Sequence, residues 1–115
     1  MVKERSVHRP TKKIEYTLQH AERACKVGWS DVVASQRNGC ADLFDRLTAD
    51  PANVDNPDKQ HRLKGNLSTT TVRGVERDQW QYEMAKGARV WYVVDRDNKT
   101  VYLTRVATAH PNQTK

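Results

Sequence analysis

The sequence has little of what would cross-link the chain or anchor it in a membrane. Its 115 residues include two cysteines, Cys25 and Cys40, which form no C-x-x-C pair and have no histidine at zinc-ligand spacing. This pattern predicts reduced, structural cysteines and no metal site. No apolar run approaches the roughly 18 residues of a membrane span, and the basic N-terminus lacks the apolar segment of a signal peptide. We therefore expect a soluble, cytoplasmic protein without cofactors.

Apolar residues are also scarce, at 37% against 30% charged residues, which predicts a small core and a heavily solvated surface. The length fits one domain. The net charge is +6, and residues 2–13 hold five basic residues and one acid. We expect a basic, flexible arm over 1–13 and a single domain over 14–115. The charge favours a polyanion or an acidic protein as partner, although basic residues also serve solubility alone.

Two helices are predicted in the first half of the chain. Helix formers dominate 21–34, but Gly28 weakens the middle and Ser30-Asp31 can restart the helix as a cap, so we expect a broken or kinked helix. A second helix follows, and Pro51 stops it. Its apolar residues recur at helical spacing: Cys40, Leu43, Phe44 and Leu47.

The second half predicts strands. Residues 52–62 are polar and contain proline, which indicates a surface loop. Short β-prone runs are separated by turn pairs, namely Arg73-Gly74, Lys86-Gly87 and Asp97-Asn98. With a short strand at 14–18, the order predicts an α+β fold, in which two helices pack on one face of a small, mainly antiparallel twisted sheet. The predicted strands are 14–18, 68–72, 80–84, 88–94 and 100–106.

Alternation along these strands predicts which side chains share a face. Arg89 and Trp91 point opposite Val90 and Tyr92, so they lie on the open side of the sheet if the latter two are in the core. Arg105 is predicted to point with Val101 and Leu103. Another predicted core face carries Trp80, Tyr82 and Met84, and Trp29 is expected to pack a helix on the sheet.

Other titratable groups show no arrangement of their own. His8, His20 and His61 share no spacing that makes a site. Glu83 and Asp95 have no acidic cluster around them, so a magnesium-dependent nuclease is not favoured.

Several short motifs resemble the RelE/ParE superfamily of toxins from bacterial type II toxin–antitoxin systems. They are Leu63-Lys64-Gly65 after a proline-bearing loop, the strand Gly87 to Asp95 with its arginine, aliphatic and aromatic residues, and a last strand ending near His110. Trp80-Gln-Tyr-Glu and the tail from His110 to Lys115 are similar to a RelE-like subgroup. The resemblance covers roughly 14–115.

The resemblance implies a toxin that inhibits translation by metal-independent, ribosome-dependent mRNA cleavage. Arg89 and His110 would be catalytic, and the RNA-binding residues would be Lys64, Arg73, Trp91 and Arg105. The implied partners are a cognate antitoxin, the ribosome and mRNA. Many RelE-like enzymes carry a second arginine where this chain has Glu83 or Met84, and a terminal tyrosine that this chain lacks.

Two alternative functions stay open at this point. The protein is a ParE-like, non-enzymatic poison of a topoisomerase, or it binds RNA without cutting it. At the level of single residues, His110 is a solvated tail histidine, and Arg89 is solvated or paired with Glu83 across the strands.

Overall fold

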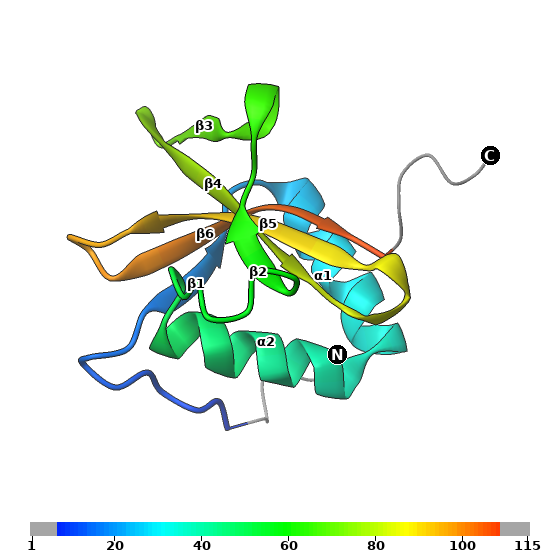
Figure 1. Ribbon diagram of the computed structural model, residues 1–115. Helices are drawn as coiled ribbons and strands as arrows, with labels where there is room; N and C mark the ends of the chain where they lie inside the picture. Colours follow the sequence, from blue (N-terminus) through cyan, green and yellow to red (C-terminus); the bar gives the residue numbers. More distant parts are fainter. Residues whose placement is uncertain (1–6, 109–115) are drawn as a thin grey trace.

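Two helices and six strands form an α+β fold in the computed structural model, which describes residues 7–108 (Figure 1). Neither helix among these residues is long and apolar enough to cross a membrane. The helices are α1 (Arg23–Ser35) and α2 (Arg37–Ala49), and single 3-10 turns lie at η2 (Gly65–Leu67) and η3 (Ala85–Gly87). The strands are β1 (Thr17–His20), β2 (Gln60–Arg62), β3 (Thr69–Val72), β4 (Val75–Glu83), β5 (Arg89–Asp95) and β6 (Thr100–Ala107).

The sheet is mixed, with strand order β1-β6-β5-β4-β2, and β3 also pairs with β4. The only parallel pairing among the described strands joins β1 to β6, and the others are antiparallel. β2 and β3 share one edge of β4, because β2 pairs with residues 80–82 and β3 with residues 75–78. In Figure 1 the β3 end of the β3–β4 hairpin stands away from the rest of the sheet.

Both helices contribute buried side chains to one core cluster with the strands. The predicted core residues of β4 and β5 are in this cluster, so the alternation along these strands is confirmed, and Trp29 packs against it. The opposite side of the sheet, here called the open face, carries Gln79, Gln81, Arg89 and Trp91. The cluster includes Val32, Cys40, Leu43, Leu47, Trp80, Tyr82, Met84, Val90, Tyr92, Val101 and Leu103.

The prediction of a surface loop over 52–62 is wrong at its C-terminal end, where β2 forms. Gln60 is fully buried, and its Nε2 donates to the Tyr92 hydroxyl at 2.9 Å, while its Oε1 accepts from Arg46 Nε at 2.8 Å. The Tyr92 hydroxyl in turn donates to the Pro51 carbonyl at 2.7 Å. These bonds satisfy the polar atoms that burial removes from water, so a polar residue occupies the core.

The first helix is continuous, which corrects the expectation of a break at Gly28. A Cβ built on Gly28 would lie 2.3 Å from the carbonyl oxygen of Val106 in β6. Glycine is therefore present because α1 approaches the β6 backbone closely, and packing on the sheet outweighs its low helix propensity.

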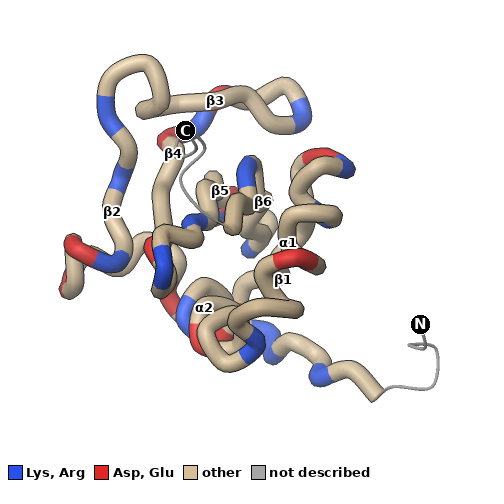
Figure 2. Tube along the Cα trace, turned by 90° about the vertical axis from the view of Figure 1, so that its right-hand side faces the viewer, with Lys and Arg blue, Asp and Glu red and all other residues tan. Residues whose placement is uncertain are grey.

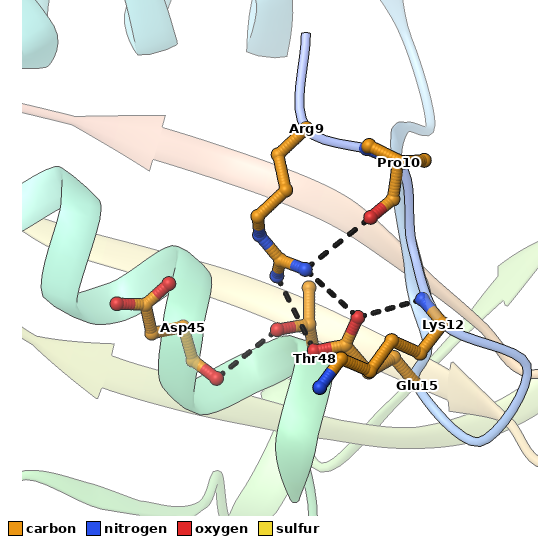
Figure 3. A network of polar contacts seen from close by, with 6 residues as sticks. All are labelled: Arg9, Pro10, Lys12, Glu15, Asp45 and Thr48. Carbon is orange, nitrogen blue, oxygen red and sulfur yellow. Dashed lines mark hydrogen bonds and ion pairs between the residues drawn. The ribbon is translucent and has the colours of Figure 1, made fainter.

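The first strand begins later than predicted, at Thr17, and Ile14 is 75% exposed. The residues before it form a turn, in which the Glu15 carboxylate accepts from the Lys12 backbone N–H at 2.8 Å and pairs with both terminal nitrogens of Arg9 (Figure 3). β1 is limited to Thr17–His20, the residues that pair with β6. The forked contact of Arg9 and the Lys12 bond lower the pKa of Glu15.

Replacing Gly28 by alanine should destabilise the fold, because the backbones of α1 and β6 must separate to admit the methyl group. We expect a loss of about 1–3 kcal/mol in the free energy of unfolding, measured by urea denaturation. Gly39→Ala in α2 is the matched control, because its nearest neighbour is the flexible end of Met84 at 3.1 Å. An unchanged stability of the Gly28 variant would contradict the close packing.

His20 at the end of β1 should make stability fall in acid. Its pKa is lowered, chiefly because burial penalises the imidazolium and also because Lys26 lies near. As pH drops below about 6.5, the unfolded chain therefore takes up the proton before the folded one does. Urea unfolding at pH 8 and pH 5 should show a smaller acid-induced loss for His20→Gln than for the unmodified protein. Equal acid-induced losses of stability in the two proteins would contradict the role of His20.

Candidate nucleic-acid interface

A row of four side chains crosses the open face at right angles to the strands. Gln81 in β4 pairs with His61 in β2 and with Trp91 in β5, and Trp91 pairs with Arg105 in β6. Directly opposite residues of antiparallel strands project to the same side of the sheet. Gln81 lies between the core residues Trp80 and Tyr82 of β4, so its side chain points to the other side of the sheet. All four residues therefore lie on the open face. We call them the cross-strand row.

The placement of Arg105 corrects the prediction that it points with Val101 and Leu103. The pairing of β5 with β6 shifts by one residue, so that Tyr92 pairs with Leu103 but Trp91 pairs with Arg105. Thr104 is the extra residue, which makes this a β-bulge. Beyond the bulge the alternation is inverted, and Arg105 lies on the open face.

Contacts within the row fix the orientation of its members. The Trp91 indole Nε1 donates to Gln81 Oε1 at 2.9 Å. The Arg105 guanidinium lies 5.4 Å from the centre of the Trp91 ring, a cation–π contact. Arg89 Nη1 approaches the same Gln81 oxygen at a longer 3.5 Å. A guanidinium stacked on a ring keeps the N–H groups at its edge for other partners, so the row can present cations and still be ordered.

A groove of about 630 Å³ lies beside the row, between β3, the start of α1 and the open face. Three predicted RNA-binding residues line it, namely Arg73, Trp91 and Arg105, together with Thr69, Thr70, Thr71 and Thr104. Arg73 lies 5.5 Å from the centre of the Tyr102 ring, so the groove contains two arginines that each make a cation–π contact with an aromatic ring. The threonines and arginines make the lining mostly polar and able to donate hydrogen bonds.

Lys64, the fourth predicted RNA-binding residue, is exposed and does not line the groove. Its loop is held by Gln79, whose backbone carbonyl accepts from Leu63 N at 2.9 Å and whose side-chain Nε2 donates to the Leu67 carbonyl at 2.9 Å. Asn66 and Leu67 do line the groove. Lys64 is therefore placed in the loop that borders the groove.

The structure describes only one of the two predicted catalytic residues, Arg89. Arg89 begins β5, directly opposite Glu83 in β4 and Ala107 in β6, and it is half-buried on the open face. His110 lies outside the described residues. Asp95 is occupied by the turn after β5, because its carboxylate accepts from Asn98 at 2.8 Å and pairs with Arg77 at 3.3 Å. The Asn98 bond is the main cause of its lowered pKa.

Positive charge is spread over the molecule. Figure 2 shows lysine and arginine on the helices as well as on the strands and loops around the open face, with acidic residues between them. Net charge therefore does not single out one surface. The groove and the row are distinguished by their combination of arginine, tryptophan and hydroxyl groups.

Sequence analysis missed two members of the row. Gln81 carried no predicted role, and its contact with Trp91 follows from the pairing of β4 with β5. His61 carried no predicted role because it shares no site-forming spacing with His8 and His20, whereas the structure places it in β2 beside Gln81. Both residues join the row through the pairing register of the strands, and strand propensity does not predict that register.

No family model, curated protein or solved structure matches this chain.

Gln81→Leu should release the Trp91 ring, because leucine offers no acceptor for the indole N–H. We expect a loss of about 1–3 kcal/mol in the free energy of unfolding, the cost of an unsatisfied donor. The indole N–H resonance of Trp91 should move upfield in a ¹H–¹⁵N spectrum. Gln19→Leu on the exposed side of β1 is the matched control. An unshifted indole resonance in Gln81→Leu would contradict the contact.

Proposed function

We propose that this protein is a RelE-like toxin of a toxin–antitoxin pair, which inhibits translation by metal-independent, ribosome-dependent cleavage of mRNA. The observation that carries the proposal is the gathering of Arg73, Trp91 and Arg105 around one groove, with Arg89 beside it. These residues come from two strands, β5 and β6, and from the turn between β3 and β4, so the gathering is a property of the fold.

The groove offers the two kinds of contact that hold single-stranded RNA. Guanidinium forks bind phosphate oxygens in pairs, and Arg73 and Arg105 are both held in place by aromatic rings. Aromatic side chains stack on unpaired bases, at about 1–3 kcal/mol per base. Because Arg105 covers part of the Trp91 ring, a base would extend the stack formed by these two side chains. The hydroxyls of Thr70 and Thr71 would supply further hydrogen bonds to sugar and phosphate, because those of Thr69 and Thr104 donate to Glu76 and Gln79.

Cleavage without a metal needs charge stabilisation at the phosphorus and two proton transfers. Arg89 is the residue proposed to stabilise the doubly charged phosphorane, and its contact with the Gln81 oxygen directs the guanidinium toward the row. In the resemblance to RelE-like toxins, His110 handles a proton. The ribosome would supply the remaining geometry by holding the mRNA in the decoding site.

A cognate antitoxin is the proposed regulator in the cytoplasm. Its toxin-binding segment would be acidic or amphipathic and would cover the arginines of the open face or a sheet edge. β1 lies at one end of the strand order, and β2 and β3 lie along the other edge, so both edges are candidate pairing sites.

Alanine variants of the site should separate chemistry from binding. In cells that express the protein, 5′-end mapping of mRNA should show cuts in phase with codons. Arg89→Ala should reduce cutting by about 100-fold or more, because it removes charge stabilisation. Arg105→Ala should weaken RNA binding and lower its salt dependence, because one phosphate contact is lost.

The matched control is Arg37→Ala, at the exposed start of α2 and away from the groove. Undiminished cutting by the Arg89 variant would reject its role. Salt-sensitive RNA binding without cutting, with ribosomes present, would replace the enzyme by an RNA-binding protein. DNA damage in place of translation arrest would favour the ParE-like poison.

A further inference from the structure

His61 stands at the β2 end of the cross-strand row, next to Gln81 and on the same face as Trp91 and Arg105. Its neighbours along β2 confirm this orientation from the other side. Gln60 points into the core, and Arg62 pairs with Trp80, a core residue of β4. His61 is half-buried at the edge of the open face.

The imidazole of His61 is oriented by the backbone. Its Nδ1 lies 3.0 Å from the Pro57 carbonyl oxygen. A carbonyl oxygen only accepts hydrogen bonds, so Nδ1 carries the proton in the neutral ring and Nε2 has the unshared electron pair. This is the arrangement of a general base that a second group holds in one tautomer.

From this arrangement we infer that His61 is the general base of the proposed RNA cleavage. The inference rests on the proposed function and adds a catalytic group to it.

The spacing of the sheet allows His61 and Arg89 to act on one phosphodiester. They are two strands and two residues apart, which corresponds to about 12 Å between their Cα atoms for strands about 4.8 Å apart and a rise of about 3.4 Å per residue. The Arg89 guanidinium leans from β5 toward β4, where it meets the Gln81 oxygen. A phosphate bound by Arg89 would therefore lie over Gln81, the cross-strand neighbour of His61.

The step is a transesterification within the RNA. His61 Nε2 accepts the proton of a ribose 2′-hydroxyl, the 2′-oxygen forms a bond to the adjacent phosphorus, and the bond from phosphorus to the 5′-oxygen breaks. The leaving 5′-oxygen takes a proton from water. The products are a 2′,3′-cyclic phosphate and a 5′-hydroxyl, and His61 returns its proton to solvent.

His61→Asn tests this role while keeping the contact with Pro57, because the asparagine Nδ2 takes the place of Nδ1. With a ribosome-bound mRNA, we expect cleavage to fall by about 10²- to 10⁴-fold, the contribution of general base catalysis. RNA affinity and melting temperature should be unchanged. In His61→Ala, added imidazole should restore part of the cleavage.

His8→Asn in the exposed N-terminal segment is the matched control. Cleavage by His61→Asn at the unmodified rate would overturn the inference and leave the proposed function intact. A fall in RNA affinity that accounts for the whole loss of cleavage would also overturn it. No cleavage by the unmodified protein on ribosomes would reject the proposed function itself. Should His61→Asn melt early, His61→Gln provides a second variant that lacks the base, without the Pro57 contact.

Discussion

The pairing register of β4 is the constraint on which the rest of this structure depends. β4 contacts three other strands, and a slip of one residue would exchange its two faces. Trp80 and Tyr82 would then leave the core, and Gln81 would leave the open face. Gln79 holds the register at the point where β2 gives way to β3, because its backbone carbonyl accepts from Leu63 and its N–H donates to the Ser68 carbonyl at 2.8 Å. One strand therefore sets both the core and the surface above it.

The bulge in β6 also shapes the candidate site. It adds Thr104 to one strand only and thereby brings Arg105 beside Trp91. The Thr104 hydroxyl donates to the side-chain oxygen of Gln79, so the same glutamine that anchors the β2–β3 loop also holds the bulge. The groove is bordered by both features. The positions of the groove residues are coupled through one buried side chain, and this is how distant segments form a single surface.

Buried polar groups support the fold in a chain with few apolar residues. Gln60 forms hydrogen bonds with Tyr92 and Arg46 beneath the sheet. On the other side, Gln79 donates to the Leu67 carbonyl and Gln81 accepts from the Trp91 indole. Each of these bonds satisfies atoms that burial removes from water, so polar side chains fill space that larger apolar ones would otherwise occupy. On the open face this has a functional consequence, because the glutamines orient aromatic and cationic side chains that remain available to a ligand.

The sequence by itself determined the α+β class, the second helix, the turns at Arg73-Gly74 and Lys86-Gly87 and the core faces of β4 and β5, because periodicity and turn chemistry are local properties. It also placed Arg89 opposite Val90. Only the tertiary structure decided that α1 passes through Gly28 without a break, that β2 exists, and that Arg105 and His61 join Trp91. Close approach of backbones, burial of a glutamine and a one-residue shift in pairing are contacts between distant segments, and no local pattern records them.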